Sequence, residues 1–228
     1  MVVVEPRVTK KMLKQLKDRI HLISRASENQ RVLNHISNPL QSALEIVEKK
    51  VKPRVVYDIF SLLSSNEASV MTRAGSVESP MFSSMVNQSE NNGHIVFMIG
   101  TIGSELEKGV DSSDDILSQW IYDIIGSELV EIIADDVENG LKKILAAHEL
   151  ELSHRFSPGY CDWSIEGQQI IFSALEAEKI DVKLTPQKMM IPKKSISCVM
   201  VSAKKVPVKS PCLLCSKKEC PFRRRRDE

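Results

Sequence analysis

The feature that most constrains the fold is a long helical pattern in the middle of the chain. From about Asp114 to Leu150, apolar residues recur at helical spacing, and the acidic stretch 111–115 offers an N-terminal cap. At 37 residues this pattern is long for a globular helix, and Asn139-Gly140 is a place where it could break or kink. The apolar positions are Ile121, Ile125, Leu129, Ile132, Val137, Leu141, Ile144 and Leu145. The pattern predicts one long helix in the middle of the chain. Its Gly126 predicts close packing against another element rather than catalysis.

Shorter patterns precede this helix. Thr9 is a cap for a helix over 10–24, and a second helical stretch covers about 28–35. A third helix is expected to begin at Pro39, because proline suits a first helical turn. Pro53 ends it, and 55–60 is expected to be a strand. The segment 64–92 is rich in Ser, Asn and Glu, which predicts a loop with one helical turn, anchored by Met81, Phe82, Met85 and Val86.

The second half of the chain alternates strands and helices. The continuous apolar run 94–101 (HIVFMIGT) predicts a buried strand. The turn Thr101-Ile102-Gly103-Ser104 then leads into a helix with Glu105 and Glu107; it is either an anion-binding turn or plain connectivity. Ser164 caps a further helix, and strands are expected at 182–184 and 195–202.

Composition indicates a soluble globular protein. Apolar residues make up 42% and charged residues 27% of the 228 residues, with a formal net charge of +1. No apolar run approaches the roughly 20 residues of a membrane helix, and nothing global points to nucleic acid. The five cysteines are an odd number, and three of them cluster near the end of the chain. That usage fits reduced thiols or metal ligands in the cytoplasm better than a disulfide framework.

The segment RFSPGYCDW, 155–163, carries the most specific functional pattern. Pro158 fixes φ and Gly159 permits a positive φ, so this is a tight turn between an arginine and a tyrosine. Arg155 presents a fork of donors that suits a carboxylate, and Tyr160 presents a ring for stacking. The alternative is a surface turn whose arginine pairs with a neighbouring carboxylate of the protein itself.

The end of the chain reads PCLLCSKKECPFRRRR and shows no helical or strand periodicity. Cys212, Cys215 and Cys220 are spaced C-x2-C-x4-C, which predicts a metal site, either an iron–sulfur cluster or zinc. A fourth ligand would have to come from Cys161 or Cys198, or one position stays open. The alternative is a redox-sensitive or inert tail. The block 223–226 is either a solvated terminus or a docking site for an acidic partner.

HRFSPGYCDW, a capped helix and LTPQKMMIPKKSISCVMV together resemble the activation domain of cobalamin-dependent methionine synthase, most of all the stand-alone proteins related to it. The resemblance covers about 95–202. It implies a single α+β domain with a mostly antiparallel twisted sheet packed by helices; strand periods alone leave α/β open. The resemblance would divide the chain into an N-terminal helical region (1–52), an activation-domain-like region (53–204) and a Cys-rich basic tail (205–228).

The resemblance also implies a ligand. The family's R-x-x-P-G-Y element helps to hold S-adenosylmethionine and falls here on Arg155, Pro158, Gly159 and Tyr160. Arg155 would take the methionine carboxylate, and the backbone from Phe156 to Tyr160 would hold the rest. The family's site also contains a later tyrosine and an upstream acid, and neither has a secure counterpart here. His148 and His154 are not at a helical ligand spacing, and no D-x-H-x-x-G motif for carrying cobalamin occurs.

Two functions follow. The first is a reactivation partner that binds S-adenosylmethionine and supports reductive methylation of cobalamin held by methionine synthase or another corrinoid protein, with a flavodoxin- or ferredoxin-type electron donor. Such a methyltransferase component needs no catalytic residue of its own, because the sulfonium is a good leaving group and the partner's cobalt is the nucleophile. The second is a non-enzymatic adaptor or electron-transfer protein for a corrinoid system, with the metal in the tail.

Overall fold

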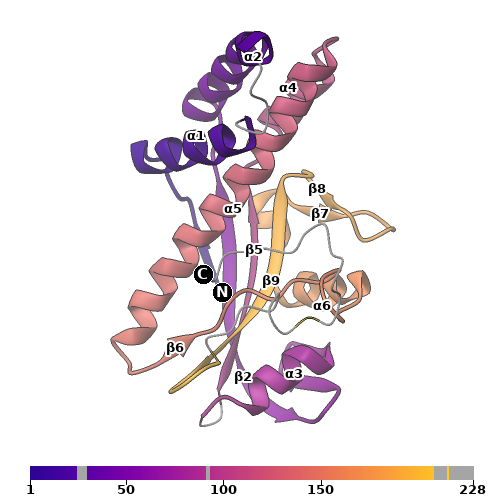
Figure 1. Ribbon diagram of the computed structural model, residues 1–228. Coiled ribbons are helices and arrows are strands. Elements are labelled where there is room, and N and C mark those ends of the chain that lie inside the picture. Colours follow the sequence, from indigo (N-terminus) through magenta and orange to yellow (C-terminus); the bar gives the residue numbers. More distant parts are fainter. Residues whose placement is uncertain (25–29, 91–92, 208–214, 216–228) are drawn as a thin grey trace.

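The computed structural model describes residues 1–24, 30–90, 93–207 and 215, and it is an α+β domain built on an antiparallel sheet (Figure 1). The strands of the main sheet are β1 (Val2–Val4), β2 (Arg54–Ser65), β3 (Ser69–Thr72), β4 (Gly75–Glu78), β5 (His94–Thr101), β6 (Glu151–Leu152) and β9 (Ser195–Ala203). Their order is β4-β3-β2-β5-β9-β6, and β1 also pairs with β2. A separate hairpin is formed by β7 (Lys183–Leu184) and β8 (Met190–Ile191).

Helices cover both faces of the sheet. They are α1 (Lys10–Ser24), α2 (Gln30–Lys49), α3 (Pro80–Asn87), α4 (Glu105–Asp111), α5 (Ile116–Ala146) and α6 (Gln168–Ala174), with short 3-10 turns at η1 (Ile165–Gly167) and η2 (Ala177–Ile180). Helices α1, α2, α4 and α5 pack on one face, and α3, α6 and η2 pack on the other. No helix in the described part of the chain is long and apolar enough to cross a membrane.

The central strand β5 explains why two cores form. Val96 and Met98 belong to the cluster under α5, whereas Ile95, Phe97 and Ile99 belong to the cluster under α3 and α6. Side chains alternate along a strand, so a strand buried on both faces must be apolar at nearly every position. Each such side chain, once buried, stabilises the fold by roughly 1.5–3 kcal/mol. This confirms the predicted buried strand with the same bounds.

The N-terminal predictions are confirmed in part. Helix α1 has the predicted bounds, and Thr9 caps it by accepting the backbone N–H of Met12 at 3.2 Å. The two helices expected at 28–35 and from Pro39 are instead one helix, α2, with Pro39 in its interior. A proline inside a helix removes one backbone hydrogen bond and crowds the carbonyl of the preceding turn, and the packing of α2 on α5 offsets that cost. Strand β1 pairs with β2, so the N-terminal region contributes to the sheet as well.

The expected loop at 64–92 is wrong. Strand β2 continues to Ser65, and β3, β4 and α3 follow within the segment. Strands β3 and β4 form a short edge hairpin in which Val70, Thr72 and Val77 are buried, whereas Met71 and Glu78 are exposed. The predicted apolar anchor is confirmed, because Phe82, Met85 and Val86 are buried on α3.

The long helix is confirmed with shorter ends. Helix α5 begins after Asp115, which caps the backbone N–H groups of Leu117 and Ser118, and it continues without a break through Gly140. Gly126 serves close packing as predicted: an added Cβ there would lie 2.9 Å from Cγ of Lys194. The expected Ser164 cap is present too, accepting the N–H of Glu166 at 3.3 Å.

Candidate functional site

The segment that follows β6 runs along the outer edge of β9. Ser153 donates its N–H to the carbonyl of Val201 (2.9 Å), and Phe156 and Val199 exchange backbone hydrogen bonds of 2.9 and 2.8 Å. Neighbouring residues of an extended chain point to opposite faces. Arg155 therefore points toward α5, whereas Phe156 points into the core under α3.

Stacked aromatic rings fix the residues on both sides of the predicted turn, Phe156 before it and Trp163 after it. Phe156 lies between Phe82 of α3 and Trp163, with ring centroids 5.6 and 5.8 Å apart, and all three rings are buried. Each such pair adds about 0.5–1.5 kcal/mol beyond its burial. Gly167 makes room for Trp163, because an added Cβ would lie 2.2 Å from its Nε1. The turn 157–162 is thus held between two fixed aromatic residues.

Asp162 attaches the turn to the N-terminus of α3. Its Oδ1 accepts from the hydroxyl of Ser79 (2.6 Å), and its Oδ2 accepts from the backbone N–H of Met81 (2.8 Å). Ser79 also caps α3 through the N–H of Phe82, and a carboxylate at a helix N-terminus is favourable. Sequence reasoning did not single out Asp162, since its partners lie about 80 residues earlier.

Two backbone N–H groups of the turn donate within the segment 157–163. Gly159, with φ +87°, donates to the carbonyl of Trp163 at 2.9 Å, and Tyr160 donates to Ser157 at 3.3 Å. Pro158 is buried, whereas Gly159 and Tyr160 are exposed, Tyr160 to 50%. The N–H of Phe156 is already used by Val199. The turn therefore exposes the Tyr160 ring and the backbone at Gly159.

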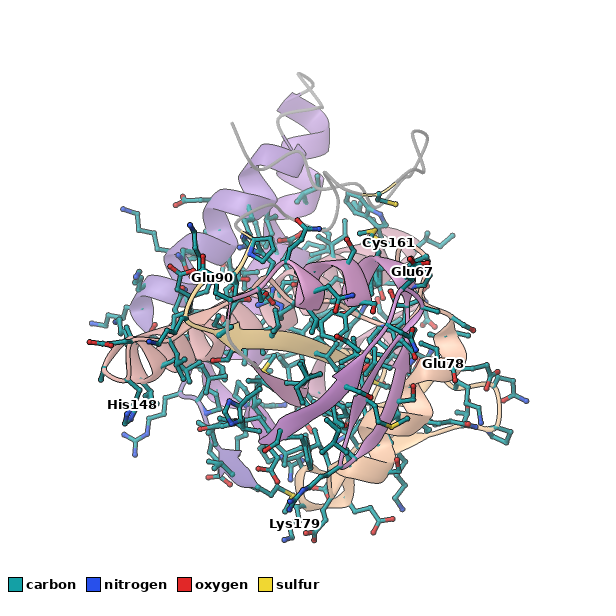
Figure 2. All side chains as sticks on the ribbon, turned by 90° about the horizontal axis from the view of Figure 1, so that it is seen from below. Glu67, Glu78, Glu90, His148, Cys161 and Lys179 are labelled. Carbon is teal, nitrogen blue, oxygen red and sulfur yellow. The ribbon has the colours of Figure 1, made fainter. Side chains whose placement is uncertain are left out.

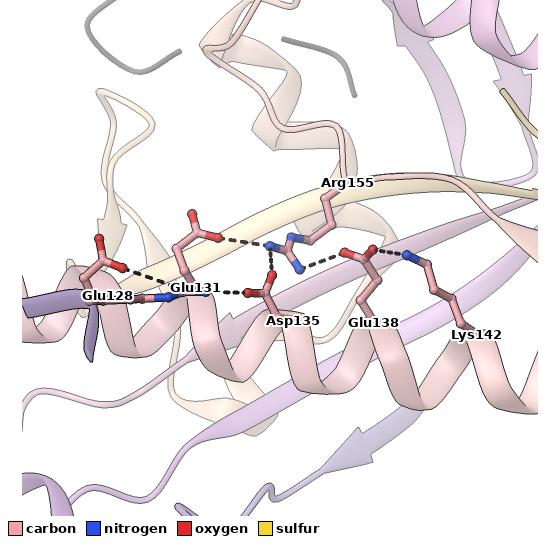
Figure 3. A network of polar contacts seen from close by, with 7 residues as sticks. Glu128, Glu131, Asp135, Glu138, Lys142 and Arg155 are labelled. Carbon is pink, nitrogen blue, oxygen red and sulfur yellow. Dashed lines mark hydrogen bonds and ion pairs between the residues drawn. The ribbon is translucent and has the colours of Figure 1, made fainter. Parts of the chain in front are cut away.

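The guanidinium of Arg155 is bound by three carboxylates of α5 (Figure 3). Its Nη1 donates to Glu138 (2.8 Å), and its Nη2 donates to Glu131 (3.0 Å) and Asp135 (2.7 Å). The spacing of these acids places them on one face of the helix. The side chain of Arg155 is only 9% exposed. This arrangement matches the alternative stated above, in which Arg155 pairs with carboxylates of the protein itself.

Two further cations complete this acid row, defined as Glu128, Glu131, Asp135 and Glu138. Arg19 of α1 donates from Nη1 to Glu128 (3.2 Å) and from Nη2 to Asp135 (3.0 Å). Lys142 pairs with Glu138 at 2.7 Å. Asp135 therefore holds an arginine on each side and connects α1 to the segment that carries Arg155. The acid row was not recognised from the sequence, although its helical spacing was visible there.

Burial and charge shift the pKa values of Asp135 and Cys198. Burial alone would raise the pKa of Asp135, but its hydrogen bonds and charge pairing with Arg155 and Arg19 lower it below the usual value. Burial raises the pKa of the Cys198 thiol to about 12, and the positive charge of Arg155 opposes that shift. Cys198 therefore stays a neutral thiol beneath Arg155.

The structure places the two main predicted side chains on different sides of one sheet edge. The guanidinium of Arg155 leaves the β9 edge toward α5, and the turn that carries Tyr160 leaves it toward α3. Pro158 and Gly159 form the bend between them. A ligand that touches both side chains would have to lie across the edge of the sheet.

The predicted metal ligands cannot be placed together. Cys212 and Cys220 lie outside the described residues, and Cys215 is described as half-buried. Among the residues with a described position, no group of three His, Cys, Asp or Glu side chains could hold a metal ion. Of the two proposed fourth ligands, Cys198 is fully buried, whereas Cys161 is half-exposed. Figure 2 shows Cys161 far from His148, so the exposed histidine is not near the turn.

The turn after β5 is occupied by internal contacts. The N–H of Ile102 donates to the carbonyl of Lys194 (3.2 Å), and the N–H of Gly103 donates to the hydroxyl of Thr101 (3.0 Å). Glu107, in the first turn of α4, accepts the N–H of Lys194 at 2.9 Å. These contacts favour plain connectivity over anion binding.

A separate open groove of about 680 Å³ lies between α1 and α2. Its lining combines apolar residues with an acidic rim: Lys17, Asp18, Ile20, Ser37, Leu40, Gln41, Leu44, Glu45 and Glu48. It contains none of the residues predicted to bind a ligand.

Comparison with known proteins gives a similarity of fold. No protein-family model matches this chain, and no curated protein sequence does. Among solved structures, the fold is similar to a crystal structure of the MetH reactivation domain bound to AdoHcy, with a TM-score of 0.65 and 15% sequence identity. The match covers 92% of this chain and 81% of that one. At this identity the similarity establishes the fold, and the chain has the fold of the MetH reactivation domain.

Proposed function

We propose that this protein binds S-adenosylmethionine at the sheet edge formed by Arg155, Phe156, Pro158, Gly159 and Tyr160. It would support reductive methylation of cobalamin carried by a separate protein, either methionine synthase or another corrinoid methyltransferase. The similar reactivation domain was solved with AdoHcy, the product that S-adenosylmethionine leaves after methyl transfer. That likeness and the RFSPGY segment support the same ligand class.

The observation that carries the proposal is the anchoring of the turn. Phe156 and Trp163 hold its ends, and Asp162 fixes it to α3, while Gly159 and Tyr160 remain exposed. A rigid turn with an exposed ring is preorganised for binding, because little freedom is lost when a ligand stacks on it.

The charges around Arg155 also suit an amino-acid group. The amino-acid group of the ligand's methionine part carries one carboxylate and one ammonium. Arg155 can pair with the carboxylate, and the neighbouring Glu131 can pair with the ammonium. Both charges of the ligand's amino-acid group would then have a partner.

The chemistry assigned to this chain is binding and orientation. S-adenosylmethionine carries a methyl group on a sulfonium, and the neutral thioether that remains after methyl transfer is a good leaving group. The methyl acceptor belongs to the partner protein. The proposed role of this chain is therefore proximity and orientation rather than proton transfer. The electron donor would be a flavodoxin or ferredoxin acting on the complex of the two proteins.

Calorimetric titration tests this proposal with two aromatic variants of similar exposure. Tyr160→Ala removes a ring that is 50% exposed on the turn, and Trp120→Ala removes one that is 49% exposed on α5. We expect S-adenosylmethionine binding in the wild type, about ten-fold weaker binding in Tyr160→Ala, the equivalent of about 1.4 kcal/mol, and no change in Trp120→Ala. Absence of binding in a folded wild-type protein would contradict the proposal.

The carboxylate network favours a second candidate. Because Arg155 is fully engaged by Glu131, Asp135 and Glu138, the fold also suits a non-enzymatic adaptor in which this arginine is structural. The function would then reside in Cys212, Cys215 and Cys220, which we propose as ligands of an iron–sulfur cluster or of zinc, with Cys161 rather than buried Cys198 as the fourth thiolate.

Metal analysis after anaerobic purification tests the tail separately. We expect iron with sulfide, or zinc, in the wild type, and loss of the metal in Cys212→Ala. Cys198→Ala is the matched control and should keep the metal, because that thiol is buried under α5. A metal-free wild type would exclude the cluster and leave the binding proposal unaffected.

A further inference from the structure

We infer that Asp135 is an internal competitor for the ligand-binding edge of Arg155, so that a ligand carboxylate binds by displacing it. The inference rests on the proposed function, because it concerns the same arginine. It assigns a regulating role to a residue of α5 that lies outside the RFSPGY segment.

The two amino groups of Arg155 are held differently. Nη1 donates to Glu138, which is only 10% exposed and is also paired with Lys142. Nη2 donates to Glu131 and Asp135, which are 26% and 38% exposed. A ligand arriving from solvent therefore meets the Nη2 edge, while the contact with Glu138 anchors the side chain.

Of the three acids that bind Arg155, Asp135 can give up its contact at the lowest cost in free energy. It is the most exposed of the three, and its second oxygen, Oδ2, already accepts from Arg19 at 3.0 Å. When its contact with Arg155 opens, Arg19 still neutralises it, so no buried charge is left without a partner.

If a ligand must displace Asp135 from Arg155, the chemistry of the ligand determines whether Asp135 weakens its binding. A compound with an amino-acid carboxylate must compete with Asp135 for Nη2. A compound with the same nucleoside and thioether but without the amino-acid group does not contact Arg155 and has nothing to displace. S-adenosylhomocysteine and 5′-methylthioadenosine form such a pair.

Titration of these two compounds against Asp135→Asn tests the inference. We expect S-adenosylhomocysteine to bind the variant about ten-fold more tightly than the wild type, the equivalent of one charge-assisted hydrogen bond. Binding of 5′-methylthioadenosine should not change. The matched control is Glu128→Gln, which removes a partner of Arg19 but none of Arg155, and neither compound should be affected.

The outcomes separate this inference from the proposed function. If the wild type binds S-adenosylhomocysteine and Asp135→Asn binds it equally or more weakly, the competition is wrong and the binding function stands. A parallel change for both compounds would likewise overturn it, since a structural effect does not distinguish them. If no form binds either compound, both proposals fail. Asp135→Ser is a second variant with the same expectation, should the asparagine variant not fold.

Discussion

Asp162 in the exposed turn accepts a hydrogen bond of 2.6 Å from Ser79, the N-cap of α3. One carboxylate thereby satisfies a helix terminus and fixes a loop that lies on the outer edge of the sheet. The bond between residues so distant in the sequence ties the candidate binding turn to the core under α3.

The first prediction concerns this link. Asp162→Ala removes two charge-assisted hydrogen bonds, to Ser79 and to the N–H of Met81. We expect the free energy of unfolding to fall by about 1.5–3 kcal/mol, measured by urea denaturation. Asp136→Ala is the control, because Asp136 is exposed on α5. An equal effect in the two variants would show that the link to α3 is not stabilising.

The second prediction compares two glycines of the same helix. An added Cβ at Gly126 would lie 2.9 Å from Cγ of Lys194, whose Nζ pairs with Asp123. An added Cβ at Gly140 meets nothing within 4 Å. We expect Gly140→Ala to raise the free energy of unfolding by about 0.5–1 kcal/mol, the ordinary gain of alanine in a helix. Gly126→Ala should lower it, because the packed lysine stem must move.

Thermal or urea unfolding of both variants checks this difference. The sign, rather than the size, is decisive. A stabilising Gly126→Ala would mean that the Lys194 side chain is free to leave the helix surface.

The third prediction concerns acid. Pairing with Arg155 and Arg19 holds the pKa of Asp135 below its usual value, against the opposing effect of burial. The folded state therefore releases this proton more readily than the unfolded chain, and the resulting stabilisation is present above the unfolded pKa of about 3.9. It is lost as the pH falls through the lowered folded pKa.

Unfolding of wild type and Asp135→Asn as a function of pH measures this contribution. We expect the wild type to be the more stable protein at neutral pH, and the difference to shrink as the pH falls below about 4. A difference that grows on acidification would mean that the folded pKa is raised.

The fourth prediction concerns Cys198. Its pKa of about 12 and complete burial keep it a neutral thiol, and the thiolate is the reactive form. We expect iodoacetamide to leave Cys198 unmodified in the native protein and to modify it after denaturation, as read by peptide mass spectrometry. Half-exposed Cys161 is the internal comparison.

The raised pKa of Cys198 also affects stability at high pH. Between about pH 9 and 12 the unfolded chain loses the Cys198 thiol proton while the folded chain keeps it, so the free energy of unfolding should fall with rising pH there.

The sequence by itself determined the elements whose signal is local. Strand β5 is a continuous apolar run, and α1 and α5 carry a helical apolar stripe with a capping side chain at the start. Packing neighbours add stability to such segments without changing their type. The hairpin of β3 and β4 was missed because its strands are only four residues long and lie in a segment rich in polar residues, and β3 depends on pairing with β2.

The tertiary structure decided what the candidate site residues contact. Arg155, Gly159 and Tyr160 could be singled out from the chain, but the sequence left open whether the arginine faces a ligand or the protein. Helix α5 decided this by placing Glu131, Asp135 and Glu138 against the guanidinium. A charge pairs with whatever lies within a few ångströms in space, and that distance depends on how α5 crosses β9 rather than on any local pattern.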